Sequence, residues 1–114
     1  MDQLTATFGA FADPTRRSLL DRLARGPASV SELARPFRIT QQAVSKHLAF
    51  LERAGLIAKR REGRQHFCAL RLERFQEAAS WMEETRKLWE ERLDRFEEYL
   101  VELKKKEDQN ENGN

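Results

Sequence analysis

The chain has 114 residues, of which 39% are hydrophobic and 35% are charged. This length and this mix are typical of one small domain with a modest core and a well-solvated surface. No apolar stretch approaches the ~18 residues of a membrane-spanning helix, and residues 1–20 lack the basic-then-apolar layout of a secretory signal. A lone cysteine excludes an intrachain disulfide. We therefore expect a cytoplasmic protein without a membrane partner.

Positive charge is concentrated in the first two thirds of the chain. Residues 14–71 contain thirteen Lys/Arg and four Asp/Glu, a net charge of +9, whereas residues 73–108 contain eight bases and twelve acids, a net charge of −4. This asymmetry indicates a polyanionic partner for the first segment. The alternative is an ordinary solvated surface.

The first predicted elements are short helices. Apolar residues at i, i+4 and i+7 predict an amphipathic helix over 4–11. Asp13 is a good N-cap and Pro14 suits the first helical position, so a second helix begins there and ends at the Gly-Pro pair 26–27.

A helix-turn-helix follows. Ser29 and Glu32 have the spacing of a capping box, which predicts the start of a short helix. Thr40 can cap the next helix, which runs through about Ala54 and ends at Gly55. Two helices joined by a turn of a few residues are the helix-turn-helix arrangement.

A β-hairpin and a helical region complete the chain. Two strands are predicted at 56–60 and 65–70, because Gly63 between them can supply the positive φ of a tight turn. Helical periodicity returns at about residue 72 and predicts two further helices, the last over about 82–103. The polar segment 104–114 is expected to be disordered.

The predicted fold class is thus mostly α with a small β-hairpin wing. The order is four helices, a hairpin and two helices, which form a winged helix-turn-helix over residues 1–103, with the wing at about 56–71 and with N- and C-terminal dimerisation helices.

The second helix of the helix-turn-helix has the features of a DNA-reading helix. Val44, Leu48 and Leu51 share the core face, which leaves Gln42 and Lys46 on the opposite face. Such a polar face can bond base edges or phosphates in a major groove, although it is also compatible with plain solvent exposure. The residues of this helix and its cap that we expect to contact DNA are Thr40, Gln41, Gln42, Ser45, Lys46 and His47.

Two of these side chains keep two interpretations. Ser45 can serve either base edges or a phosphate. His47 lies about 60° from the core face, so it can touch a phosphate or fill the edge between helices.

The hairpin turn is strongly basic. Arg60, Arg61 and Arg64 surround one glycine, and Lys59 is next to them. Repelling charges in so tight a turn do not help folding, so an anionic partner explains them better than a solubilising loop does. An arginine at a hairpin tip can lie on phosphates or enter a narrow minor groove.

Several motifs resemble those of the ArsR-type winged-helix repressors of bacteria, namely DPTRR at 13–17, VSKHL at 44–48, AGL at 54–56 and REGR at 61–64. The later pattern Trp81…Trp89…Arg92-Leu93-Asp94…Tyr99-Leu100 is similar to a subgroup without metal ligands. The resemblance covers about residues 4–103. It implies a homodimeric repressor that binds a short inverted repeat of double-stranded DNA, often in its own promoter.

Metal sensing is not expected from the residues present. Metal-sensing members of this family carry a Cys-x-Cys-type motif in the first helix of the helix-turn-helix, but residues 32–36 of this chain contain no thiol. Other members use Asp and His of the C-terminal helix, and no histidine follows His66. His66 and Cys68 would share one sheet face, but two ligands are too few for a closed zinc site. We expect Cys68 to pack and His66 to contact a phosphate or remain a polar strand residue.

Apolar stripes near both ends predict a dimer. The C-terminal stripe repeats at spacings of 4, 3, 4 and 3, which is the seam of a coiled coil. Intramolecular packing of both stripes in a monomer is the alternative. The expected interface residues are Leu4, Phe8, Phe11, Trp89, Leu93, Phe96, Leu100 and Leu103.

The sequence therefore predicts a sequence-specific DNA-binding regulator, not an enzyme, with no cofactor and with double-stranded DNA and a second copy of itself as partners. No glycine loop for phosphates and no catalytic triad spacing is present in the sequence. Two alternatives remain: a metal- or thiol-responsive sensor of the same fold, and a winged-helix adaptor that binds another protein. The sequence does not identify a small-molecule effector.

Overall fold

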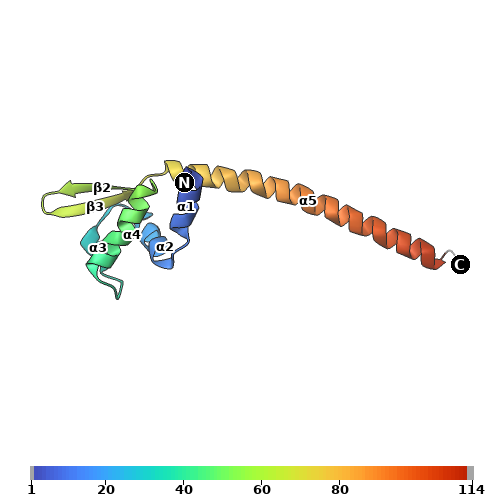
Figure 1. Ribbon diagram of the computed structural model, residues 1–114, viewed down its shortest axis with the longest axis horizontal. Helices are drawn as coiled ribbons and strands as arrows, with labels where there is room; N and C mark the ends of the chain where they lie inside the picture. Colours follow the sequence, from blue (N-terminus) through green and yellow to red (C-terminus); the bar gives the residue numbers. More distant parts are fainter. Residues whose placement is uncertain (1, 113–114) are drawn as a thin grey trace. The chain divides into compact units, whose positions relative to one another are not determined.

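The computed structural model describes residues 2–112 (Figure 1). The chain forms two compact units, one ending at Ala79 and the other beginning at Ser80. The fold class predicted from the sequence, mostly helical with a β-hairpin wing, is confirmed. The elements are α1 (Gln3–Phe11), α2 (Pro14–Leu23), β1 (Ala28–Ser29), α3 (Val30–Ala34), α4 (Gln41–Arg53), β2 (Ile57–Glu62), β3 (Gln65–Leu70) and α5 (Glu73–Asn112).

Side-chain caps fix where the first helices begin. The side chains of Asp13, Ser29 and Thr40 each accept a hydrogen bond from the backbone N–H three residues further on, at 3.0–3.1 Å. These bonds satisfy N–H groups that have no partner within the helix. The predicted starts of α2, α3 and α4 are therefore confirmed. Asp2 caps α1 in the same way, which the sequence analysis did not anticipate.

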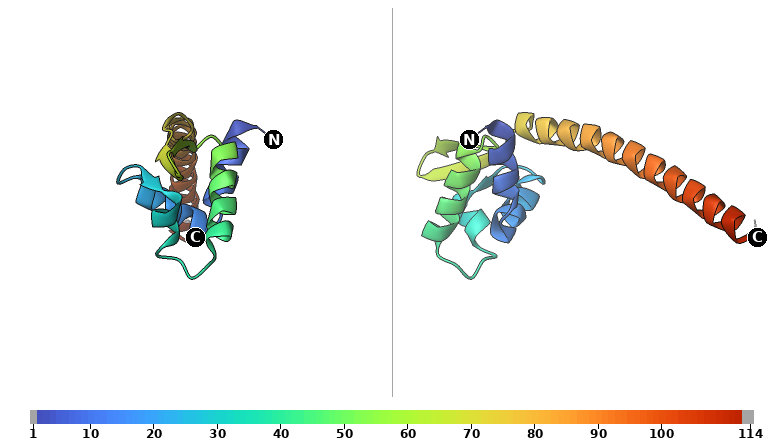
Figure 2. Two further views of the ribbon diagram at one scale, coloured as in Figure 1. Left: turned by 90° about the vertical axis from the view of Figure 1, so that its left-hand side faces the viewer. Right: turned by 45° about the vertical axis from the view of Figure 1, so that its right-hand side comes forward.

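The wing belongs to a three-stranded antiparallel sheet in the order β1-β3-β2. Gly63 has a φ of +62° in the turn between β2 and β3, as predicted. Strand β1 was not predicted, because two residues are too short to show an alternating pattern. Its Ala28 lies opposite Cys68 of β3, and both residues are buried. Helices α2 and α3 contact β3, and α4 (green in Figure 2) contacts β2.

The core of the first unit lies between the helices and the sheet. The predicted apolar faces of α2, α3 and α4 all contribute to it. Close packing of this kind fixes the orientation of each helix about its own axis. The largest fully buried side chains are Leu19, Leu33, Leu48, Leu51, Leu56, Ile57, Val44, Thr7 and Cys68.

The C-terminal region differs from the sequence-based expectation. One helix, α5, replaces the two predicted helices, and it continues through Asn112 where the sequence predicts a disordered tail from residue 104. No Gly or Pro lies within α5 to interrupt it, and Glu102 and Lys106 have the i,i+4 order that favours a helix. Residues 113 and 114 of the predicted tail lie outside the described residues. No helix within residues 2–112 is long and apolar enough to span a membrane.

The core position of α4 gives a first test. Leu48 is fully buried, so Leu48→Ala should lower the free energy of unfolding by about 2–5 kcal/mol, through lost burial and the cavity that remains. Leu72→Ala is the control, since Leu72 is 58% exposed and its loss should change stability by no more than about 0.5 kcal/mol. Urea denaturation at a fixed protein concentration measures both values, and equal effects of the two changes would contradict this core.

The cap of α2 gives a second test, based on pH. The hydrogen bond from the Arg16 backbone N–H, helped by the nearby His47, holds the pKa of Asp13 below its ordinary value of 3.8. A lowered pKa in the folded state means that the ionised cap stabilises the fold above the unfolded-state pKa, and that this contribution is lost as the pH falls through the folded-state pKa.

Asp13→Asn is the matched variant, because asparagine caps helices as well as aspartate does but does not titrate. Wild-type stability should therefore decline relative to Asp13→Asn as the pH falls below 3.8, measured by urea denaturation at a series of pH values. A difference between the two proteins that stays constant across this range would contradict the role of the Asp13 carboxylate.

Candidate nucleic-acid interface

Helix α4 has one buried face and one polar face. Val44, Leu48 and Leu51 are fully buried in the core, as the sequence predicts. Gln42 and Lys46 are exposed. The packing of the apolar face therefore determines which side chains α4 presents to a partner, and these carry amide and amine groups that can bond bases or phosphates.

The start of α4 is connected to α3. The Thr40 hydroxyl accepts the 3.1 Å hydrogen bond from the Ala43 backbone N–H, so its oxygen already serves as the helix cap. The Gln41 side-chain amide donates to the Ser31 hydroxyl at 3.5 Å. The Gln41–Ser31 bond therefore links the first residue of α4 to α3, the other helix of the helix-turn-helix.

His47 lies beside the cap of α2. Its Nδ1 is 3.8 Å from Oδ1 of Asp13, and its side chain is 26% exposed. Of the two interpretations from the sequence, this geometry places His47 at the edge between helices, with enough exposure to meet an anion as well.

Arg16 connects α1 with α4. Its guanidinium group donates to the backbone carbonyls of Gly9 and Ala10 at 3.1 and 3.0 Å. It also lies over the Phe50 ring, with Cζ 4.1 Å from the ring centroid. These bonds satisfy carbonyls at the end of α1, where helices lack internal partners, and the stacking adds a cation–π contact to α4. This role of Arg16 is not apparent from the sequence alone, because it depends on how α1 and α4 pack.

The wing arginines are not equivalent. Arg60 pairs with Glu62 on the same strand, which offsets part of its charge. The Arg61 Nε donates to the Gly63 carbonyl at 3.1 Å and so braces the turn. Arg64 has no hydrogen bond or ion pair to any other residue in the part of the chain that the structure describes.

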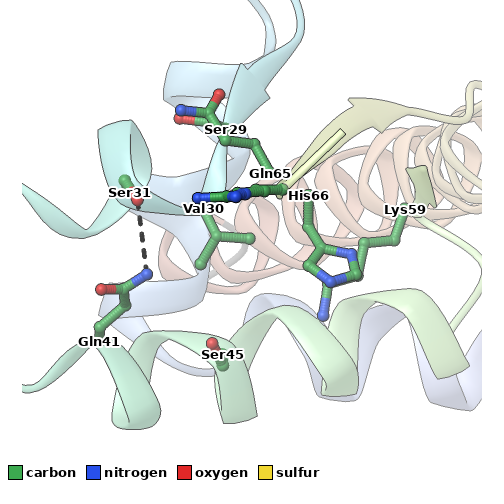
Figure 3. A pocket seen from close by; sticks show the side chains of 9 residues that line it. Ser29, Val30, Ser31, Gln41, Ser45, Lys59, Gln65 and His66 are labelled. Atoms are coloured by element: carbon green, nitrogen blue, oxygen red, sulfur yellow. Dashed lines mark hydrogen bonds between the residues drawn. The ribbon is translucent and has the colours of Figure 1, made fainter. Parts of the chain in front are cut away.

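A small cavity lies between α4 and the wing. Gln41 and Ser45 of α4 line it with Arg64, and so do Lys59 of β2 and His66 of β3 (Figure 3). Lys59 and His66 lie on the same sheet face because the register pairs Lys59 with Cys68, two positions from His66. The sequence alone does not reveal that both residues lie near Ser45, because this depends on how the sheet packs on α4.

Cys68 is inside the core, as predicted. It is fully buried, and burial raises the pKa of its thiol. A buried thiol with a raised pKa is a poor nucleophile and a poor metal ligand. Within residues 2–112, no group of three or more His, Cys, Asp or Glu side chains could hold a metal ion.

The two predicted dimer stripes differ in exposure. Phe11 packs against the core of the first unit and stacks on Phe75, with ring centroids 5.7 Å apart. Leu4 and Phe8 are partly buried. In the second unit the stripe of α5 is exposed by 39–58%, and its members are Trp89, Leu93, Phe96, Leu100 and Leu103.

Comparison with known proteins gives consistent matches. A family model described as a helix-turn-helix domain matches residues 11–60. The transcriptional repressor SdpR of Bacillus subtilis (strain 168) is 35% identical over 75 residues, which are 66% of this chain and 83% of SdpR. The HTH-type transcriptional regulator Rv2034 of Mycobacterium tuberculosis is 48% identical over 54 residues, which are 47% of this chain and 50% of that protein.

A solved structure is similar over a longer part of the chain. The crystal structure of an ArsR family transcriptional regulator, RHA00566, matches with a TM-score of 0.75 and 47% sequence identity. The match covers 78% of this chain and 98% of that one.

Proposed function

This chain belongs to the ArsR family of DNA-binding transcriptional regulators, and we propose that it is a repressor that binds an inverted-repeat operator as a homodimer. The main support is the outward face of α4, which is polar and is held in place by fully buried residues beside a basic wing. SdpR, to which the chain is similar, is named a repressor.

In this proposal α4 enters the major groove and the wing lies on the backbone or in the adjacent minor groove. Gln42 is exposed near the start of α4, and glutamine can pair bidentately with adenine. Lys46 and the wing arginines neutralise phosphates. The proposed DNA contacts are Thr40, Gln41, Gln42, Ser45, Lys46, His47, Arg60, Arg61 and Arg64.

A dimer follows from the exposed stripe of α5 and from the demands of specificity. One recognition helix reads few base pairs, and two copies related by a two-fold axis double the contacts and make the operator an inverted repeat. The stripe consists of leucine and aromatic side chains that are about half exposed along one helix face. Covering them with a second copy removes apolar surface from water and so stabilises the dimer. We propose that α1 also meets the partner subunit through Leu4, Phe8 and Phe11, which are each only partly buried.

The regulator would act on DNA in the cytoplasm, and its own upstream region is the first place to search for the operator. Binding of this kind depends strongly on salt, because each neutralised phosphate releases counterions. An adaptor that held another protein through an apolar surface would show little salt dependence. Fluorescence anisotropy on upstream DNA across a salt series separates the two functions, and an absence of binding at low salt would contradict the repressor.

Base reading and backbone binding can be separated by mutation. Gln42→Ala should reduce discrimination between operator and random DNA by about 1–3 kcal/mol, because it removes a contact with a base edge. Arg61→Ala should weaken binding to both DNAs about equally and reduce the salt slope. Gln76→Ala on α5 is the matched control and should change neither quantity. If Gln42→Ala left discrimination intact while Arg61→Ala abolished it, these roles would be reversed.

The dimer can be tested on the α5 stripe. Changing Leu93 and Phe96 together to Glu should give monomers in sedimentation experiments and a collapse of operator affinity, because charges would replace the buried seam. Val101→Glu is the control, since Val101 is also exposed but lies outside the spacing of the stripe. A wild-type protein that is monomeric at micromolar concentration and still binds a palindrome tightly would contradict the dimer.

A further inference from the structure

The cavity between α4 and the wing has a volume of about 180 Å³. This is below the ~300–1,000 Å³ of pockets that hold drug-sized ligands. Figure 3 shows Gln41 and Ser45 on α4 and His66 and Lys59 on the wing side of the same space. A cavity of this size suits one small ion or one group of a larger molecule.

The charged side chains around the cavity, Lys59 and Arg64, are both cationic. Lys59, Arg64 and His66 line it, and none of its nine lining residues is acidic. Among residues 2–112, these three side chains have no ion pair with a carboxylate. Arg60, one position along β2 from Lys59, is in contrast paired with Glu62. The cavity therefore combines uncompensated positive charge from β2 and from the turn that follows it.

Neutral hydrogen-bond donors complete the cavity wall. Ser31 and Ser45 contribute hydroxyls, and the Gln41 amide is held against Ser31 at 3.5 Å. Hydroxyl, amide, ammonium and guanidinium groups are the set that proteins use for phosphate oxygens. Carboxylates, the usual charged ligands of divalent cations, are absent from this wall.

We propose that this cavity binds a single phosphate group, and that its source is one phosphodiester of the DNA backbone. This inference rests on the proposed function, because the cavity lies between the two elements that would contact DNA. A phosphate held there would bridge Ser45 of α4 and Lys59 of the wing, and would fix how deep α4 sits in the groove. Ser45 and Gln41 then position the helix on the backbone, while Gln42 reads the bases.

A shared phosphate makes a quantitative prediction. Each neutralised phosphate contributes about 0.9 to the slope of log affinity against log salt. The double variant Lys59→Gln/Arg64→Gln should therefore lower this slope by about 0.9 per subunit, because both cations serve one phosphate. Two cations on two separate phosphates would give about 1.8 per subunit, and this result would overturn the shared site.

Ser45→Ala supplies a second readout that does not depend on charge. It should weaken binding to operator and random DNA by the same factor. A loss confined to the operator would show that Ser45 reads bases and would overturn its assignment to the phosphate.

Lys87→Gln on α5 is the control for the loss of positive charge in the double variant, and it should leave the slope of log affinity against log salt unchanged. Circular dichroism checks that each variant is folded, and Arg64 lies in an exposed turn where substitution leaves the core intact.

Competition with inorganic phosphate tests whether the cavity binds the free ion as well as a phosphate of the DNA backbone. Inorganic phosphate is added to the DNA titration, with chloride adjusted to keep ionic strength constant. If phosphate weakens DNA binding more than chloride does, and the double variant lacks this difference, the cavity also accepts the free ion. No extra competition, together with the lowered slope of the double variant, means that it accepts the backbone phosphate alone. An unchanged slope in the double variant would overturn the proposal, whereas a wild type that binds no DNA would contradict the proposed function itself.

Discussion

The burial of one face of α4 is the constraint on which the functional surface depends. Val44, Leu48 and Leu51 are inaccessible to solvent, and this fixes the rotation of the helix about its axis. Because side chains in an α-helix recur every 3.6 residues, the same packing directs Gln42 and Lys46 outward. The surface that we propose to contact DNA is thus determined by residues that cannot touch it.

Two further connections place α4 relative to its neighbours. Arg16 links the last carbonyls of α1 to the ring of Phe50 on α4. Cys68 of β3 is buried in the same core as the apolar face of α4, and this packing fixes the sheet against α4. A change in α1 or in the sheet would therefore shift α4 through packed contacts. For this reason we treat the wing and α4 as one surface.

Local signals made most of the fold predictable. Caps at Asp13, Ser29 and Thr40, and the turn glycine Gly63, each act within a few residues and were read correctly from the sequence. Strand β1 was missed because its only pattern is its pairing with β3, which lies far away in the chain. The two helices expected after the hairpin are one, since no residue interrupts α5. The cavity depends on both strand register and packing. The sequence therefore identifies the residues that line it but does not show that they lie close together.

The central claim is that two copies of α4 read neighbouring major grooves on one face of the DNA. Hydroxyl-radical footprinting of the operator tests it most directly, because protection reports which backbone positions each subunit covers. The account predicts two protected patches on the same face, with centres about 10 base pairs apart or a multiple of that distance. One isolated patch, or protection that runs evenly around the duplex, would contradict it.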